Sequence, residues 1–96
     1  MPDTASTPLT AITVRLVYLA RLREAFGCSG EALALAGPRP TVGAALDALR
    51  AREGAWRQEL APGRAVRVAV NHELAALDAR LRDGDEVALL PPVTGG

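Results

Sequence analysis

One amphipathic helical stripe lies between segments that alternate like β-strands, and this order constrains the fold more than any other feature. Four apolar residues have the i, i+3, i+4 and i+7 spacing that lines one face of a helix: Val42, Ala45, Leu46 and Leu49. Thr41 stands where an N-cap belongs, directly after the break at residues 37–40. Gly54 is a typical helix stop. The sequence therefore predicts one main helix between Thr41 and Gly54.

Five short segments have the alternation or the β-branched composition of strands. They span residues 12–19, 31–36, 66–70, 74–76 and 86–90. A helical turn fits residues 20–26 and a second short helix fits the region of Trp56 and Leu60. This order predicts an α+β fold in which a mixed sheet of about five strands carries the main helix on one face. If the first and last strands are both central, they pair in parallel, as in a β-grasp (ubiquitin-like) fold.

Length and charge bound the other possibilities. Ninety-six residues make one domain. We expect this domain at residues 11–90, after a disordered leader at 1–10 and before a flexible tail at 91–96. Eleven basic residues balance eleven acidic ones, so nucleic acid and anionic membranes are not expected partners. No secretory signal or membrane-spanning stretch is visible in the sequence, which favours a cytoplasmic protein.

The carboxyl terminus carries the strongest functional signal. An apolar strand leads into a segment without long side chains: Pro91, Pro92, Val93, Thr94, Gly95 and Gly96. The prolines favour an extended chain, and the glycines allow entry into a narrow slot of another protein. We therefore interpret the tail as a segment inserted into a partner, with the Gly96 carboxylate as its reactive group. Ala88 and Leu90 face away from the core, and we expect them to contact that partner.

The other candidate residues have ordinary explanations. Cys28 has no basic cluster near it in the sequence, so we interpret it as incidental rather than sulfur-accepting. His72 lacks a visible catalytic partner and fits a solvated turn. Asp83, Asp85 and Glu86 are typical of a turn. We expect no metal site and no catalysis by the chain alone, because neither a ligand set nor a nucleophile–base pair is present.

Several segments together resemble one known family, the small subunit of molybdopterin synthase and its ubiquitin-like sulfur-carrier relatives. The resemblance covers residues 12–96 and rests on residues 17–24 with Gly27, 41–46, 70–71, 83–88 and 91–96. Its most specific part is Asp-Gly-Asp-Glu-Val followed, after apolar residues, by Pro-Pro-Val-Thr-Gly-Gly. Gly-Gly alone is a much weaker signal.

The resemblance implies a sulfur carrier with a β-grasp fold. An activating enzyme would consume ATP to adenylate the Gly96 carboxylate, and sulfur would then replace the adenylate to give a thiocarboxylate. The tail would donate this sulfur to cyclic pyranopterin monophosphate in molybdenum cofactor biosynthesis. No cofactor would be bound permanently. The implied partners are the activating enzyme and the synthase large subunit, the latter in a heterotetramer of two small and two large subunits.

Three alternatives stay open. Carriers for the thiazole of thiamine, for thiolated tRNA or for cysteine share the fold and the Gly-Gly end, although the ending and the helical region near Trp56 favour molybdopterin. A ubiquitin-like modifier would join Gly96 to a lysine of another protein. All eleven basic residues are arginines, so this chain offers no lysine for isopeptide-linked chains of itself. A pure interaction module would not use Gly95 and Gly96.

Overall fold

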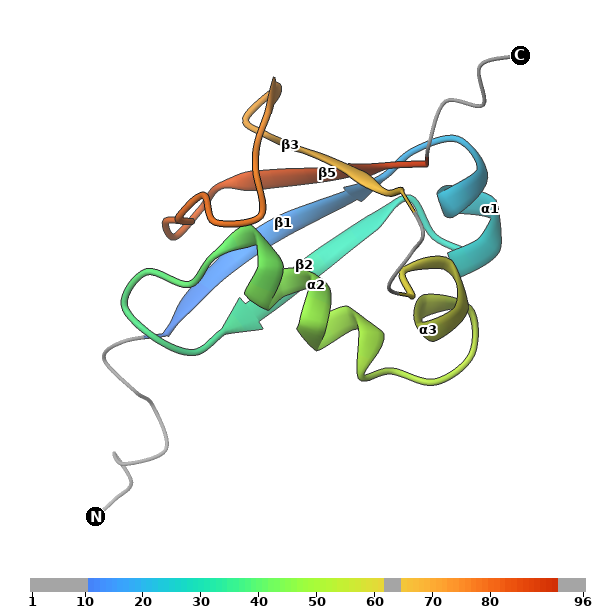
Figure 1. Ribbon diagram of the computed structural model, residues 1–96, viewed down its shortest axis with the longest axis horizontal. Coiled ribbons are helices and arrows are strands. Elements are labelled where there is room, and N and C mark those ends of the chain that lie inside the picture. Colours follow the sequence, from blue (N-terminus) through green and yellow to red (C-terminus); the bar gives the residue numbers. More distant parts are fainter. Residues whose placement is uncertain (1–10, 62–64, 92–96) are drawn as a thin grey trace.

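The computed structural model describes residues 11–61 and 65–91, which form one five-stranded sheet and three helices (Figure 1). In chain order the elements are β1 (Ile12–Tyr18), α1 (Arg21–Phe26), β2 (Gly30–Leu35), α2 (Val42–Arg50), α3 (Ala55–Glu59), β3 (Arg67–Val70), β4 (Glu73–Leu74) and β5 (Glu86–Leu90). None of the helices in the described ranges is long and apolar enough to span a bilayer.

The first and last strands lie side by side within the sheet. The strand order is β2-β1-β5-β3-β4, and β1 pairs with β5 in parallel while the other pairs are antiparallel. The last strand is therefore held between two others, with α2 crossing one face of the sheet (Figure 1). This is the β-grasp architecture predicted from the sequence.

The strands alternate between two environments. On β1, the even-numbered residues 12–18 are buried, whereas Thr13 and Arg15 are exposed. The buried side chains pack against the predicted apolar stripe of α2, all of which is buried. We call the side of the sheet covered by α2 the core face and the opposite side the open face.

The main helix begins where the sequence predicts and ends earlier. The Thr41 Oγ1 accepts the backbone N–H of Ala44 at 3.1 Å, which is N-capping. The helix ends at Arg50, so the predicted stop at Gly54 is wrong. Gly54 instead precedes α3 with φ 80°, and its carbonyl accepts the N–H of Gln58 at 3.1 Å. The glycine is needed for the positive φ that starts the next helix.

A polar network beside three aromatic rings fastens α3 to the sheet. The Tyr18 hydroxyl donates to Glu31 at 2.5 Å, and Arg52 donates to both Glu31 oxygens at 2.7 and 3.1 Å. Arg52 also lies 5.0 Å from the Trp56 ring centre, and Phe26 stacks on Trp56 at 4.9 Å. The Arg52 hydrogen bonds lower the pKa of Glu31, while burial and the bond to Glu31 raise that of Tyr18.

Candidate functional site at the root of the tail

The last strand is held on both sides up to its end. The Leu89 carbonyl accepts the backbone N–H of Leu19 at 3.2 Å, and Leu90 is paired with Arg67 of β3. Pro91, which is half-buried, follows directly. The tail therefore starts from a fixed point at the centre of the sheet, beside α1 (Figure 1).

The predicted site residues divide between described and undescribed parts of the chain. Five of them lie outside the described residues: Pro92, Val93, Thr94, Gly95 and Gly96. Ala88 and Leu90 lie on the open face, opposite in direction to the buried Val87 and Leu89. Ala88 is only 9% exposed, because it sits on the central strand between β1 and β3. Leu90 is half-buried.

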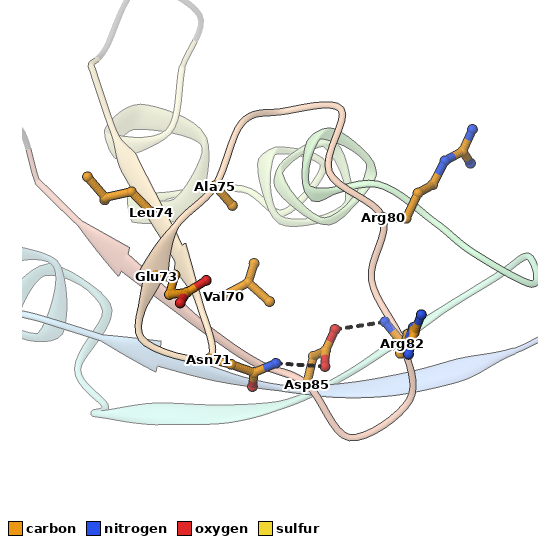
Figure 2. Close-up of a pocket in the computed structure, with 8 residues that line it drawn as sticks. All are labelled: Val70, Asn71, Glu73, Leu74, Ala75, Arg80, Arg82 and Asp85. Carbon is orange, nitrogen blue, oxygen red and sulfur yellow. Dashed lines mark hydrogen bonds between the residues drawn. The ribbon is translucent and has the colours of Figure 1, made fainter.

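Strand register places Ala88 in the middle of an apolar row that crosses all five strands. Ala88 is paired with Val17 on one side and with Ala69 on the other. Val17 is paired with Gly30, and Ala69 with Leu74. Paired residues share a face, so these five form one line on the open face, which we call the apolar row. Leu74 is 67% exposed and points to the opposite side of its hairpin from Val70 (Figure 2).

Charged residues border the apolar row. Toward the tail, Arg67 lies opposite Leu90, and both are on the open face. On the far side, Arg15 is paired with Glu86. An apolar centre with a polar rim is the usual anatomy of a protein–protein interface.

Gly30 keeps the β2 end of this row flat. A Cβ atom at this position would lie 2.3 Å from the Leu16 carbonyl oxygen, a distance that backbone atoms do not tolerate. The close approach of β1 and β2 therefore requires glycine here. Together with Ala69 and Ala88, it leaves a surface on which a partner can approach the sheet closely.

A strained turn lies next to the tail root. Ala20 has φ 52° and ψ −128°, a conformation that residues with a Cβ rarely adopt. It connects β1 to α1 and follows Leu19, which holds Leu89. The sequence contains no sign of this strain, because alanine is also an ordinary residue for the start of a helix.

The predicted turn residues fix the opposite end of the sheet. Asp83 accepts the N–H of Thr13 at 2.8 Å, and Asp85 accepts the N–H of Arg82 at 2.8 Å and the Asn71 side chain at 3.0 Å. The two Asp85 bonds border a hollow of about 390 Å³ (Figure 2). Asp83 and Asp85 thus have the turn-forming role that the sequence predicts, whereas Glu86 is the first residue of β5.

Cys28 and His72 do not join a reactive cluster in the described ranges. Cys28 is half-buried and packs against the core. His72 is exposed in the β3–β4 turn, with its Nε2 atom 3.7 Å from Glu86. No group of three or more metal-binding side chains occurs among residues 11–61 and 65–91.

Four members of the apolar row were missed by sequence reasoning: Val17, Gly30, Ala69 and Leu74. Alternation alone assigns a residue to one face of its own strand. It does not say which residues of other strands stand beside it. The register that aligns these residues depends on the parallel pairing of β1 with β5.

Comparison with known proteins supports the fold and identifies relatives. The chain is 39% identical over 83 residues to the molybdopterin synthase sulfur carrier subunit of Escherichia coli, covering 86% of this chain and 99% of that protein. The small archaeal modifier protein 1 of Haloferax volcanii is 31% identical with a TM-score of 0.69, over 85% of this chain and 99% of that one. A ubiquitin of Caldiarchaeum subterraneum shares the fold, with a TM-score of 0.59 at 22% identity. The match covers 90% of this chain and 99% of that one.

The family assignment rests on the match over most of the chain. The ThiS family profile matches residues 16–96, which include every strand from the middle of β1 onward and the tail. The chain belongs to the ThiS family.

Proposed function

We propose that this protein is the sulfur carrier subunit of a molybdopterin synthase. The observation that carries the proposal is the 39% identity to a protein with that function over 99% of its length. The geometry agrees with it, because β5 is fixed on both sides and delivers a narrow Gly-Gly tail from a defined point. A carrier whose reactive group is its own terminus needs such a root.

The proposed chemistry takes place at the Gly96 carboxylate. A carboxylate oxygen attacks the α-phosphorus of ATP, which releases pyrophosphate and leaves an acyl adenylate. A sulfur nucleophile at the oxidation level of sulfide then displaces AMP, so a thiocarboxylate forms without oxidation or reduction. Transfer of the sulfur to cyclic pyranopterin monophosphate, with water supplying oxygen, returns the carboxylate. The use of ATP agrees with a cytoplasmic location.

The tail has the reach for these reactions. An extended residue spans up to about 3.5 Å, so a fully extended segment of the length of residues 91–96 can reach roughly 20 Å. Pro91 and Pro92 restrict the free tail, which reduces the entropy lost when it enters a partner. Both the activating enzyme and the synthase large subunit can therefore accept the terminus in an enclosed site while the folded domain stays outside.

We further propose that the large subunit docks on the apolar row. This row is bordered by charged side chains and lies next to the tail root, so a partner covering it is positioned to receive the tail. The finished synthase is a heterotetramer of two small and two large subunits. Ala88 and Leu90 lie in this contact, with Leu90 between the row and the tail.

Intact mass tests the carrier function. The chain is incubated with a molybdopterin-pathway activating enzyme, ATP and a sulfide donor. We expect a mass gain equal to replacement of one oxygen by one sulfur, mapped to Gly96 by fragmentation. The matched control lacks Gly95 and Gly96 and should fold normally without gaining sulfur. An unchanged wild-type mass, with the activating enzyme shown active on its own carrier, would contradict the proposal.

A ubiquitin-like modifier is the second candidate, favoured by the similarity to small archaeal modifier protein 1. An acyl adenylate can be attacked by a lysine amine as well as by sulfur, so both functions share the first step. The modifier function predicts Gly96 joined to lysines of other proteins in cell extracts. Because the chain has no lysine, such adducts would carry single copies unless its N-terminal amine is used.

A further inference from the structure

The described residues cover only part of the outer edge of β3. The β3–β4 hairpin turns at Asn71 and His72, which have φ 51° and 75°, the values of a tight two-residue turn. On the return, the Ala75 N–H bonds the Val68 carbonyl at 2.9 Å. The chain then leaves the sheet, since the Leu77 and Ala79 carbonyls accept N–H groups at the start of α2.

The backbone groups of Val66 and the N–H of Val68 are therefore left at the sheet edge, whereas the Val68 carbonyl is bonded by Ala75. Arg67 points its backbone groups toward β5, where it is paired with Leu90. By the alternation of an antiparallel strand, the N–H groups of Val66 and Val68 point the other way. No described residue accepts either of them. An edge of this kind is a template for another strand.

An apolar hollow lies along this edge. Its volume is about 280 Å³, and its walls are Val66, Arg67, Val68 and residues 74–77. This is below the roughly 300–1,000 Å³ typical of small-molecule pockets, so it suits a few protein side chains. Leu74 and Leu77 are 67% and 59% exposed, the most exposed large apolar side chains in the described ranges. Arg67 adds one positive charge.

We propose that an extended segment of the synthase large subunit adds to the β3 edge as a further strand. This inference rests on the proposed function. Leu74 belongs both to the apolar row and to the hollow, so a partner seated on the row reaches the edge without a gap. The added strand should have apolar side chains at every second position, so that they enter the hollow. It should also carry an acidic side chain opposite Arg67. Backbone bonds supply affinity and the hollow supplies selectivity.

Calorimetry with the purified large subunit tests this edge. Leu77→Asp changes the hollow but not the apolar row, and an acidic residue beside the α2 N-terminus is compatible with the fold. We expect this variant to bind about tenfold more weakly or worse, as for a central interface side chain. The matched control is Ala48→Asp on the exposed side of α2, which should bind like wild type. Circular dichroism verifies that both variants fold.

Hydrogen exchange of the complex gives a second readout. Strand addition predicts that the Val66 and Val68 amides become protected when the large subunit binds. Unchanged affinity of Leu77→Asp together with unprotected amides would overturn the inference, and the proposed function would stand if wild type still binds. Absence of wild-type binding would overturn both. A concentration-dependent dimer of the free chain that Leu77→Asp abolishes, with large-subunit affinity unchanged, would assign the edge to a second copy instead.

Discussion

The two faces of β5 place residues one position apart in opposite roles. Val87 and Leu89 face α2 and are each 1% exposed, whereas Ala88 and Leu90 face the open side beside the tail root. The core face is built from large aliphatic side chains that fill the space under the helix. The open face carries small residues across the sheet centre. If the large subunit docks on the open face, as we propose, one strand separates stability from recognition.

The largest effect should come from truncating the core face. Leu16 is 1% exposed and is paired with Val87 across the centre of the sheet. Leu16→Ala leaves a cavity there, so we expect the free energy of unfolding to fall by about 2–5 kcal/mol in chemical denaturation. At temperatures where the variant stays folded, its affinity for the large subunit should be near wild type. A loss below 1 kcal/mol would mean that this face is not tightly packed.

Leu90→Asp should weaken binding at the open face and leave the fold nearly as stable. The side chain is half-buried and lies opposite Arg67, so an aspartate there meets a positive charge and the fold should lose little stability. We expect calorimetry to show large-subunit binding weakened by about tenfold or more, because a charge would be buried in an apolar contact. Ala48→Asp serves as the control on α2. Equal affinities for wild type and Leu90→Asp would remove this residue from the interface.

The two faces also differ in how far the sequence reveals them. The α2 stripe and the alternation of β1 identified the core face, because burial of every second residue is a local property. The β5 bounds and the outward direction of Ala88 and Leu90 followed from the same rule. These positions required no knowledge of neighbouring strands.

Non-local geometry was not predictable in the same way. The apolar row depends on the parallel pairing that brings Val17 beside Ala88, two residues far apart in the chain. The early end of α2 depends on α3, which needs Gly54 for its own start. Nothing in the sequence pattern places Arg52 beside β2, yet it bonds Glu31. The apolar row and the Arg52 bond thus depend on contacts between distant segments, whereas the end of α2 depends on the helix that follows it.

Glu31→Gln tests the polar end of the core face. Glu31 is paired with Leu16 and accepts bonds from Tyr18 and Arg52. Removing its charge leaves Arg52 without an anionic partner, so we expect unfolding to become easier by about 1–2 kcal/mol. The control is Asp47→Asn, which removes the exposed ion pair with Arg50 and should change stability by about 0.5 kcal/mol or less.

The effect of Glu31→Gln should depend on pH in a defined direction. The folded state lowers the pKa of Glu31, chiefly through the Arg52 hydrogen bonds, from an ordinary value of 4.5. A lowered folded pKa gives a stabilisation that is complete above the unfolded pKa and is lost as pH falls through the folded one. The free energies of unfolding of wild type and variant should therefore differ most above pH 4.5 and become equal in stronger acid. A difference that grows in acid would contradict this assignment.

The smallest expected effect is a gain in stability from Ala20→Gly, in the turn between β1 and α1. The φ of 52° and ψ of −128° strain alanine, and glycine removes that strain. Glycine also gives the unfolded chain more entropy, so the net gain should be about 1 kcal/mol or less. Ala48→Gly is the matched control, because within α2 the same change should destabilise by about 1 kcal/mol. Changes of opposite sign in the free energy of unfolding, measured by chemical denaturation, would verify the strain at Ala20. A similar loss of stability in both variants would refute it. Because the Leu19–Leu89 bond uses backbone atoms that both variants retain, neither change should alter large-subunit affinity.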